Sequence, residues 1–385
     1  MDVSVNLLQF LERHRLSPEQ SEPKTIFLIV NGVCNGRCLM CDVGQRSSGS
    51  QFCGVMQRGG MSLDFVRFLV DEVKRWRPCI SITSTEPLLY KPLFEAIKII
   101  KDAGLRVELT TNGILLPEFA DALLDARVDS VCVSLDGPKE VHDRVRGYRG
   151  CFSRAVEGIR CIVEGGRRSM DLRISTTILP LNQDKLYDAV KVVERFSPKA
   201  HVFTHMNFVT EEMAEAHNQR FPQYKATASS VAVLDPRQIN PTTVLAQVNL
   251  MRRDFPHVKV VPNLNSERLI KTYYHEHSRF LPGADHCRAV FKVAQVSADG
   301  YLFGSTRCLN YPLGHVQELG GFMNAWNGSV MKRFREDLIN AGGAFPACTA
   351  AADSSRHIWK SMGLYRLISG KVVKRIRIKE HFYLN

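Results

Sequence analysis

The sequence lacks any run of about 20 uninterrupted apolar residues, so it offers no segment that would cross a membrane as a helix. Residues 1–23 lack a compact apolar stretch before a small-residue cleavage site, so no secretory signal is predicted and a cytoplasmic location is expected. The 26 glycines follow no period, and valine, isoleucine and leucine are spread evenly, which excludes collagen, coiled coil and disorder. At 385 residues the chain is too long for one minimal core, so we expect a large domain and a smaller one.

The chain is also short of negative charge: 39 Asp and Glu stand against 51 Lys and Arg, and the formal net charge is +12. The basic residues gather at Arg144, Arg146 and Arg149, at 167–168, and in a tail over 371–379. Such an excess attracts an anionic small molecule, a nucleic acid or a membrane surface. Aromatic residues do not interleave with the basic ones as they do in base-stacking surfaces, so we interpret the clusters as solvated surface and expect no nucleic-acid partner.

Cysteine, by contrast, is abundant, with eleven residues. The count is odd, no export signal accompanies it, and three cysteines fall within eight residues. Metal binding or redox chemistry therefore explains them better than a disulfide framework. Five others have no ligand-like grouping: Cys53, Cys79, Cys132, Cys151 and Cys161.

From residue 25 to about residue 206, short β-rich runs alternate with stretches of helical periodicity. Over 61–76, for example, Phe65 and Leu69 share one helix face, and Ser62 is the expected N-cap. The expected strands are Thr25–Val30, Cys79–Thr83, Arg106–Thr110, Ser130–Ser134, Leu172–Thr177 and Val202–Met206. This alternation predicts an α/β fold, a partial (β/α)6 TIM-like barrel whose polar strand ends carry the chemistry.

After this stretch the alternation ends. Helices are predicted over Thr210–Tyr224 and Thr242–Phe255, separated by polar residues and prolines. From His286 onward, short strands and turns followed by a helix around Val330–Ile339 predict a small C-terminal α+β domain. The expected organisation is an N-terminal extension over 1–24, the barrel over 25–209, a connecting region over 210–285, the small domain over 286–355 and a basic tail over 356–385.

The first expected strand is followed by Cys34-Asn-Gly-Arg-Cys38-Leu-Met-Cys41. Three thiolates on one tight loop can hold three corners of a [4Fe–4S] cluster and leave the fourth iron open to a bidentate small molecule. Gly36 lets the backbone turn closely around the cluster, and Arg37 is placed to offset its negative charge. The alternatives are three buried cysteines or a zinc site, but zinc favours four ligands in paired spacings, and no second pair follows nearby.

By spacing and position this loop resembles the cluster motif of the radical S-adenosylmethionine (SAM) superfamily. The resemblance covers residues 25 to about 206. It implies that the open iron chelates the amino and carboxylate groups of SAM. One electron then cleaves SAM to methionine and a 5′-deoxyadenosyl radical, which abstracts a substrate hydrogen. The residue before the third cysteine, often aromatic in the family, is Met40 here.

The same resemblance implies SAM-binding residues at the next two strand ends. Where the family carries Gly-Gly-Glu-Pro, this chain has Ser84, Thr85, Glu86 and Pro87. Glu86 would accept hydrogen bonds from the ammonium group of SAM. Ser84 and Thr85 replace two glycines and so restrict the approach of the backbone to the ligand. Asn112 lies in a Thr-Asn-Gly turn like that of the family.

The fourth expected strand ends in Ser134-Leu-Asp136-Gly-Pro and continues into His142 and Arg146, a run similar to that of sulfatase-maturase-like and peptide-modifying members. By this resemblance Asp136 belongs to the cofactor-binding set, and Ser134 and Arg154 are candidates for the SAM carboxylate. Each motif alone has a structural explanation as a turn or helix start. Because they occur in the family's order along successive strand ends, the motifs together are specific for the family.

Three C-terminal cysteines stand where the twitch or SPASM-type extension of the same family has cluster ligands: Cys287, Cys308 and Cys348. An Asp-Gly hairpin, a Leu-Gly and a Trp-Asn helix lie between them in the family's order, which implies an auxiliary [4Fe–4S] cluster. The family's last cysteine is Ala351 here. The alternatives are an open iron, ligation by Asp353 or His357, or structural cysteines without a cluster.

The resemblance therefore implies an enzyme that abstracts a hydrogen atom and takes electrons from a donor such as flavodoxin or ferredoxin. The substrate we expect is a small polar, sugar-like molecule. No side chain is assigned to catalysis. His205 and Asn207 lie at the end of the sixth expected strand, and we expect them to point to where the substrate would lie. A lone histidine there is as often structural as catalytic. Two other functions stay open: oxidative or crosslinking modification of a peptide or protein side chain, and a non-catalytic iron–sulfur protein that has lost SAM binding. A third alternative, a nucleic-acid modifier, is suggested by the net charge alone.

Overall fold

The computed structural model describes residues 17–50, 53–54, 59–83, 85–166, 170–276, 287, 289–304 and 311–348. The strands are β1 (Thr25–Leu28), β2 (Cys79–Ile82), β3 (Arg106–Thr111), β4 (Ser130–Ser134), β5 (Asp171–Ile178), β6 (Ala200–His205), β7 (Val258–Val261), β8 (Val293–Val296), β9 (Tyr301–Phe303) and β10 (Pro312–His315). The α-helices are α2 (Asp42–Gln45), α4 (Leu63–Val73), α5 (Leu93–Asp102), α6 (Leu116–Asp125), α7 (Lys139–Arg146), α8 (Cys151–Glu164), α9 (Leu186–Glu194), α10 (Glu211–Arg220), α11 (Pro241–Asp254), α12 (Glu267–His275), α13 (Ala289–Lys292), α14 (Phe322–Trp326) and α15 (Ser329–Asn340). Short 3-10 helices cover Lys74–Trp76, Pro87–Leu89, Pro222–Tyr224 and Pro236–Gln238.

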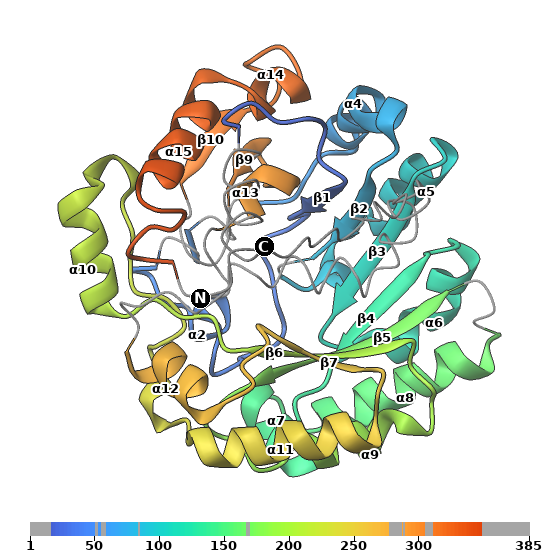
Figure 1. Ribbon diagram of the computed structural model, residues 1–385. Coiled ribbons are helices and arrows are strands. Elements are labelled where there is room, and N and C mark those ends of the chain that lie inside the picture. The colour runs from blue at the N-terminus through green and yellow to red at the C-terminus, as the bar shows by residue number, and fades with distance from the viewer. Residues whose placement is uncertain are drawn as a thin grey trace, which may run out of the picture.

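The described strands form one sheet in the order β10-β9-β8-β1-β2-β3-β4-β5-β6-β7, so β10 and β7 are its two edges and the barrel is open. Strands β1 to β7 run parallel. Helices α4, α5, α6, α8, α9 and α11 surround the sheet on its outer side (Figure 1). The predicted partial barrel and all six of its predicted strands are confirmed. The seventh parallel strand, β7, lies in the expected connecting region and was not predicted.

Helix α4 shows how the local sequence builds these layers. Ser62 Oγ accepts a hydrogen bond from Phe65 N at 3.1 Å, which confirms the predicted N-cap. Phe65 and Val73 are buried on the face that packs against the sheet. The helix ends at Val73, and Trp76 follows in a 3-10 turn, where its indole N–H donates to Pro23 O at 3.1 Å. The predicted helix is therefore one turn too long.

The C-terminal strands continue the same sheet. Strand β8 pairs in parallel with β1, and β9 and β10 follow as antiparallel neighbours. Gly300, with a φ of +87°, occupies the turn between β8 and β9, a conformation that favours glycine. The predicted hairpin and the predicted helix at α15 are confirmed. Because the sheet runs without interruption from β1 into β8, the division of the chain into five parts stays a prediction.

Residues 18–23 lie against the C-terminal helices. Trp326 and Arg335 donate to backbone carbonyls of this segment at 3.0 and 2.8 Å, and Asn327 exchanges two hydrogen bonds with Gln20. The Arg335 guanidinium also lies 4.2 Å from the centre of the Trp326 ring. The described end of the N-terminal extension is thus held by α14 and α15.

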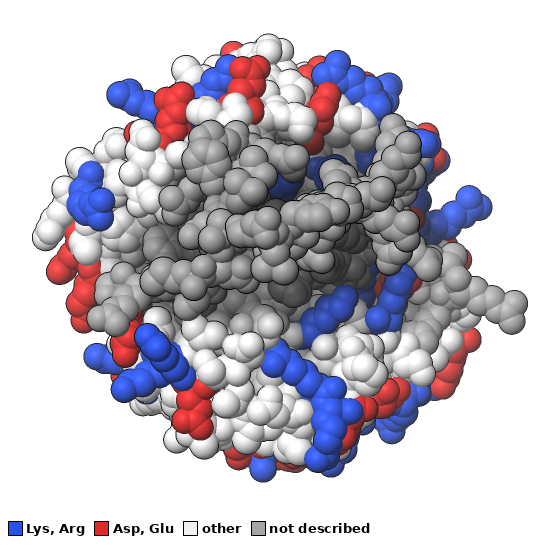
Figure 2. Space-filling model, viewed as in Figure 1, with Lys and Arg blue, Asp and Glu red and all other residues white. Residues whose placement is uncertain are grey.

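Acidic and basic side chains are intermixed around the rim of the face shown in Figure 2. Arg160, for example, pairs with Glu157 and Glu164 on its own helix. For the residues on this rim, the intermixed charges agree with the interpretation as solvated surface. For Arg146, which belongs to the predicted basic clusters, that interpretation is wrong, because its side chain is buried and paired with Asp136. Two of the basic clusters, at 167–168 and 371–379, lie outside the described residues. In the described part of the chain, no helix is long and apolar enough to span a bilayer.

Candidate active site

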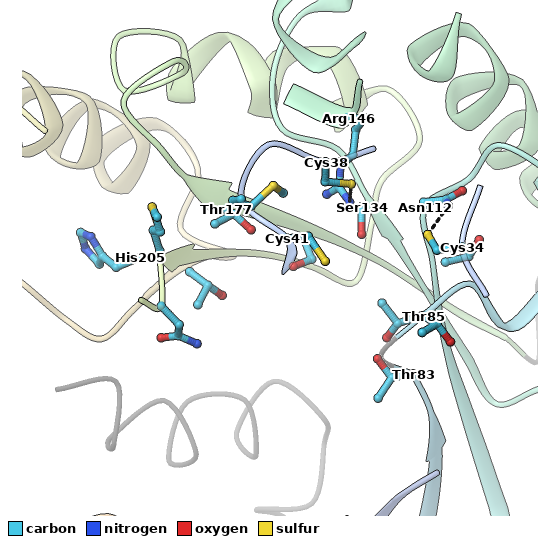
Figure 3. A pocket seen from close by; sticks show the side chains of 17 residues that line it. Cys34, Cys38, Cys41, Thr83, Thr85, Asn112, Ser134, Arg146, Thr177 and His205 are labelled. Atoms are coloured by element: carbon cyan, nitrogen blue, oxygen red, sulfur yellow. Dashed lines mark hydrogen bonds between the residues drawn. The ribbon is translucent and has the colours of Figure 1, made fainter. Parts of the chain in front are cut away.

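A pocket of about 260 Å³ lies at the carboxyl ends of the parallel strands. The loop that follows β1 contributes Cys34, Cys38 and Cys41 to its wall, and Figure 3 shows the three thiol-bearing side chains around one space. Carboxyl ends of parallel strands meet at one edge of a sheet, which is where such folds bind their ligands. The predicted thiol loop therefore lies at the predicted edge. We call residues 34–41 the thiol loop.

The last turn of α7 holds the thiol loop in place. Arg37 N donates to Arg146 O, and Leu39 N donates to Val145 O, both at 2.9 Å. Gly147 ends α7 with a φ of +59°, and a Cβ atom at this position would lie 2.4 Å from Arg37 O. Only glycine permits this approach, so the helix end and the loop form one unit.

Asp42, directly after the third cysteine, anchors the other end of the loop. Its carboxylate is buried and accepts hydrogen bonds from Ser50 Oγ at 2.6 Å, Ser229 Oγ at 2.7 Å and Ser230 N at 2.8 Å. A buried carboxylate needs such donors. These contacts join the thiol loop to the segment after β6, 187 residues further along the chain. No local pattern in the sequence marks Asp42 as an anchor, because its partners Ser229 and Ser230 are so far away along the chain.

Hydroxyl side chains line much of the remaining wall. They come from the ends of β2 to β6: Thr83, Thr85, Thr110, Thr111, Ser134, Ser175, Thr177 and Thr204. In β5, strand alternation selects which hydroxyls face the pocket. Ser175 and Thr177 face the pocket, whereas Thr176 faces the other way and donates to Leu135 O at 2.5 Å. The sequence indicated these strand ends but not which hydroxyls face the pocket.

Glu86 is fully buried, and its carboxylate is occupied by donors of the protein itself. It accepts hydrogen bonds from Leu88 N at 3.1 Å, Thr111 Oγ1 at 2.8 Å and Asn112 N at 2.8 Å. Burial raises the pKa of Glu86 to about 6. It is not among the described residues that line the pocket. Its observed role is to tie the end of β3 to the turn after β2, and contact with the SAM ammonium stays a prediction.

Asn112 lines the pocket beside the first thiol. Its Nδ2 donates to Asn35 Oδ1 at 2.8 Å and to Cys34 Sγ at 3.8 Å. Its Oδ1 accepts from Ile114 N at 2.9 Å, which fixes the orientation of the amide. Because Glu86 also holds its backbone, Asn112 is a positioned donor to Cys34.

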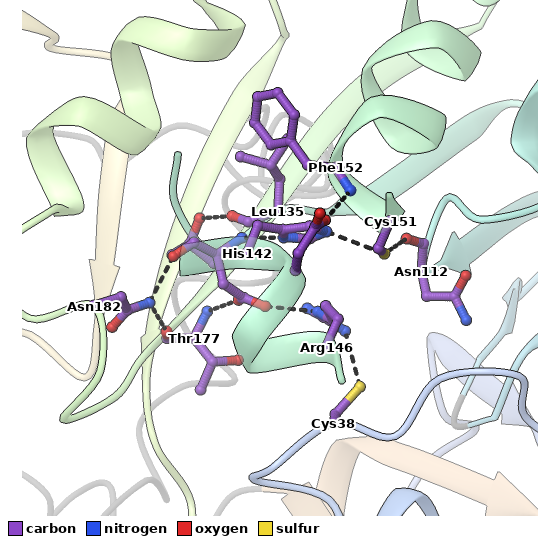
Figure 4. A network of polar contacts seen from close by, with 12 residues as sticks. Cys38, Asn112, Leu135, His142, Arg146, Cys151, Phe152, Thr177 and Asn182 are labelled. Atoms are coloured by element: carbon purple, nitrogen blue, oxygen red, sulfur yellow. Dashed lines mark hydrogen bonds and ion pairs between the residues drawn. The ribbon is translucent and has the colours of Figure 1, made fainter. Parts of the chain in front are cut away.

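Asp136 and Arg146 form a buried ion pair next to the thiol loop. Figure 4 shows the contact of Arg146 with Cys38. Arg146 Nε donates to Asp136 Oδ2 at 2.6 Å, and Arg146 Nη1 donates to Cys38 Sγ at 3.8 Å. The other carboxylate oxygen accepts from Thr177 N at 2.9 Å, and the backbone oxygen of Asp136 accepts from Asn182 Nδ2 at 2.8 Å. Arg146 is among the described residues that line the pocket and Asp136 is not. The predicted cofactor-binding residue Asp136 thus reaches the pocket through Arg146, which was not assigned to the site.

A second buried chain of hydrogen bonds joins the ends of β4 and β3. Asp136 N donates to His142 Nδ1 at 3.0 Å, which leaves the ring proton on Nε2, 3.2 Å from Cys151 Sγ. Cys151 Sγ donates to Asn112 O at 3.8 Å. Burial lowers the pKa of His142 to about 4, so its ring is neutral near pH 7. Cys151 therefore has a structural role in this network.

Two further predicted residues, Thr85 and Ser134, line the pocket. Thr85 Oγ1 donates to Asn31 O at 2.9 Å, which fixes its hydroxyl. Ser134 lies at the end of β4, close to Cys38 in the view of Figure 3. The remaining residue of this motif, Ser84, lies outside the described residues.

Arg154 lies apart from these residues, on α8. Its Nε donates to Ile114 O at 2.8 Å, and its guanidinium pairs with Glu118. It is not among the described pocket residues. Its assignment to the SAM carboxylate has no support from these contacts and stays a prediction.

The two candidates at the end of β6 differ in orientation. Asn207 lines the pocket. His205 borders it, but its ring points away from the thiol groups (Figure 3), donates or accepts a hydrogen bond with Tyr274 Oη at 2.9 Å and packs against Tyr273. Burial lowers the pKa of His205 to about 3. His205 is therefore a neutral residue that secures α12 to β6.

The donor set of the thiol loop fits an iron–sulfur cluster. Thiols are the ligands that such clusters take, and three of them reach one pocket. Among the described residues, no three Cys, His, Asp or Glu side chains come together as ligands of one metal ion. A cluster would take each of the three thiolates at a different corner. Thiols bind iron as thiolates, so iron binding at this loop would release protons.

The structure describes two of the three predicted C-terminal ligands, since Cys308 lies outside the described residues. Cys287 N donates to Gly343 O at 2.6 Å, and Cys348 N donates to Phe345 O at 2.8 Å. Cys287 is thereby tied to the turn that leads to Cys348, and both pack against the core. Three other positions named for this site also lie outside the described residues: Ala351, Asp353 and His357. The auxiliary cluster stays a prediction.

Comparison with known proteins identifies related sequences for the barrel. The model of the radical SAM superfamily matches residues 28–193. An AdoMet-dependent heme synthase from Methanosarcina barkeri is 31% identical over 185 residues, which are 47% of this chain and 50% of that protein. A probable GTP 3′,8-cyclase from Methanococcus maripaludis is 27% identical over 213 residues, 52% of this chain and 69% of that protein. The matches to heme synthases span half or less of the length of those enzymes.

Solved structures share the architecture over most of the chain. Native anSMEcpe with bound AdoMet has a TM-score of 0.59 and 16% identity, and the match covers 89% of this chain and 98% of that one. Streptococcus suis SuiB bound to S-adenosylmethionine has a TM-score of 0.59 and 14% identity, with 87% and 74% covered. At these identities the likeness concerns the fold.

Proposed function

From the match of residues 28–193 to the radical SAM superfamily model, we propose that the chain is an enzyme that binds a [4Fe–4S] cluster at Cys34, Cys38 and Cys41 and cleaves SAM reductively. One observation carries the proposal: three thiols of one loop and the hydroxyls of five strand ends face the same pocket. When bound, the cluster supplies one electron to SAM, which yields methionine and a 5′-deoxyadenosyl radical that abstracts a substrate hydrogen. An external one-electron donor, such as flavodoxin or ferredoxin, supplies the electron.

Within this proposal the chain's own side chains bind and orient the ligands. Asn112 and Ser134 present an amide and a hydroxyl beside the thiols, and we assign them to the amino-acid part of SAM. Glu86 holds Asn112 through its backbone N–H at 2.8 Å. Asp136 holds Arg146 at 2.6 Å. The buried carboxylates thus position residues of the pocket wall.

The substrate we propose is a small polar molecule, such as a sugar. The described wall contains eight Ser and Thr side chains and two Asn side chains, which pair with hydroxyl and amide groups rather than with apolar surface. Thr204 and Asn207 lie at the β6 side of the pocket, and Thr83 and Thr85 lie at the β2 side. We assign the β6 side to the substrate, because the SAM candidates Asn112 and Ser134 follow β3 and β4.

The test is anaerobic reconstitution of the wild type beside a Cys34→Ala/Cys38→Ala/Cys41→Ala variant, with iron and sulfide quantified in both. Dithionite and SAM are then added, and 5′-deoxyadenosine is measured. We expect product from the wild type and only background from the variant. A wild type that binds iron but forms no 5′-deoxyadenosine supports the non-catalytic alternative. Sugars, peptides, a tetrapyrrole and GTP, the last two taken from the names of the relatives, are then compared as enhancers of the reaction.

The same variant tests the proposed auxiliary cluster at Cys287, Cys308 and Cys348. If that cluster forms on its own, about four irons remain per chain after the thiol loop has lost its ligands. A Cys287→Ala/Cys348→Ala variant should lose these four irons and keep those of the thiol loop. Complete loss of iron in the thiol-loop variant would identify the C-terminal cysteines as structural.

A further inference from the structure

Arg146 is the one side chain with a permanent charge among the described residues that line the pocket. Its Nη1 lies 3.8 Å from Cys38 Sγ, and its Nε is held by Asp136 at 2.6 Å. The residue is 9% exposed, so water and salt screen its charge little. A thiolate at Cys38 therefore accepts a charge-assisted hydrogen bond from a fixed, buried guanidinium.

Reduction adds one negative charge to a cluster and its thiolates. A buried positive charge and a hydrogen bond to a ligand sulfur both favour the reduced state, and both are factors that set the potentials of iron–sulfur clusters. We infer that Arg146 raises the reduction potential of the cluster proposed at the thiol loop, with Asp136 as the residue that positions it. The inference rests on the proposed cluster, and it names Arg146 as the side chain that makes reduction of that cluster easier.

The other arginine near the thiols has a different environment. Arg37, which the sequence suggested as the charge that offsets the cluster, is exposed, and its described hydrogen bonds use its backbone. Charges in water are screened and contribute little. The structure therefore moves the predicted role from Arg37 to Arg146, and it makes Arg37 a matched control in the same loop.

Asp136 explains why Arg146 keeps this orientation. Its two carboxylate oxygens are divided between Arg146 Nε and Thr177 N, at 2.6 and 2.9 Å, so the carboxylate is fixed from both sides. The backbone of Arg146 is fixed as well, because its carbonyl accepts from Arg37 N at 2.9 Å. The guanidinium is thus set in place before any ligand binds.

The experiment measures the midpoint potential of the cluster anaerobically. Wild type, Arg146→Gln, Arg146→Lys and Arg37→Gln are reconstituted, their iron is counted, and the EPR signal that changes on addition of SAM is followed during a reductive titration. For Arg146→Gln we expect reduction to become at least tenfold less favourable, which is about 59 mV for a one-electron couple. Arg146→Lys keeps the charge and should recover most of this shift. Arg37→Gln should change the equilibrium by less than about threefold.

Arg146→Gln leaves the buried Asp136 without its partner, so this variant is paired with Asp136→Asn/Arg146→Gln, which removes both charges. If only the double variant folds, a lower potential in it supports the inference. Equal shifts in the Arg146 and Arg37 variants, or wild-type potentials in the folded Arg146 variants, overturn it. A tenfold loss of SAM affinity with an unchanged potential also overturns it and identifies Arg146 as a ligand contact. A wild type without iron refutes the proposed cluster itself.

Discussion

The sheet buries an arginine–carboxylate pair near each end of its strands. At the carboxyl end, Arg146 meets Asp136 at 2.6 Å. Near the amino end, Arg173 Nη1 lies 3.5 Å from Glu108 Oε1, and Arg173 Nη2 lies 3.8 Å from Asp171 Oδ2. Both arginines are less than a tenth exposed. The same residue types are thus buried by the same sheet in two different ways.

The two pairs differ in how well their polar atoms are satisfied and in what lies beside them. The carboxylate of Asp136 has a donor on each oxygen, and Arg146 reaches a pocket and a thiol. Near the amino end, Glu108 Oε1 and the Nε and Nη2 atoms of Arg173 have no hydrogen-bond partner in the described residues. In barrels of this type the amino-terminal face contributes stability and the carboxyl-terminal face carries the chemistry. A pair whose polar atoms are all hydrogen-bonded and which lies next to a thiol indicates a role in positioning the side chain. A pair with buried atoms that lack hydrogen bonds indicates a role in packing.

The largest difference between the two pairs is expected in the free energy of unfolding when one carboxylate is removed. Asp136→Ala leaves Arg146 as an uncompensated buried charge and removes the acceptor of Thr177 N, so it should lower the free energy of unfolding by about 3–5 kcal/mol. Glu108→Ala removes weaker contacts, and its expected cost is about 1–3 kcal/mol. Denaturant unfolding of both variants measures this difference. Equal costs would mean that the two pairs are energetically alike.

A smaller effect is expected at the contact between α7 and the thiol loop. In Gly147→Ala the new Cβ would lie 2.4 Å from Arg37 O at a φ of +59°, so we expect a loss of about 2–3 kcal/mol and weaker retention of iron. Gly150 is the control, because it also has a positive φ, +88°, but has open space around its Cβ position. Gly150→Ala should cost about 1 kcal/mol and leave the iron content unchanged. If both variants lost iron, the contact between Gly147 and the thiol loop would not be what retains the iron.

The carboxyl edge could be predicted from sequence because its signals are local. The spacing of Cys34, Cys38 and Cys41 is contained within eight residues, and Ser134 directly follows the apolar run of its strand. Strand β7 carries the same short apolar pattern in Val258–Val261, but it follows a region that looked irregular.

What the sequence did not indicate depends on contacts between distant segments. Asp42 meets Ser229 across 187 residues. Whether Arg37 or Arg146 faces Cys38 is decided by how α7 packs on the thiol loop, 108 residues apart, and no pattern within either segment reports that packing. The role of Glu86 shows the limit of resemblance, since a family motif names the residue but not the three protein donors that surround it.

The two ends of the strands should also respond to pH with opposite signs. Burial lowers the pKa of His142 from 6.5 to about 4, so its contribution to stability is present above pH 6.5 and is lost as the pH falls towards 4. The difference in unfolding free energy between wild type and His142→Gln should shrink by roughly 2 kcal/mol from pH 8 to pH 5.

Glu108 provides the opposite case. Burial raises its pKa, so its contribution is present at low pH and is lost as the pH rises through the folded-state pKa. The difference between wild type and Glu108→Gln should therefore shrink as the pH increases. Parallel pH profiles for the His142 and Glu108 variants would contradict the assignment of these two environments.

The smallest effect is expected when the amino-end pair is replaced as a whole. Glu108→Leu/Arg173→Met removes two buried charges together and leaves neither uncompensated, and such exchanges are often neutral or stabilising. We expect a change of no more than about 1 kcal/mol in the free energy of unfolding and an unchanged yield of 5′-deoxyadenosine. The reason is that buried atoms of Glu108 and Arg173 have no hydrogen-bond partner among the described residues, so their removal from the interior offsets the lost attraction.

The same exchange at the carboxyl end, Asp136→Leu/Arg146→Met, is the matched comparison. It also removes both charges, so its cost in stability should be far below that of Asp136→Ala. It nevertheless takes the guanidinium away from Cys38 Sγ, and the yield of 5′-deoxyadenosine should fall while the iron content is kept. If this variant retained full activity, the pair at the carboxyl end would be packing like its counterpart, and the position of Arg146 beside the thiol would have no bearing on the reaction.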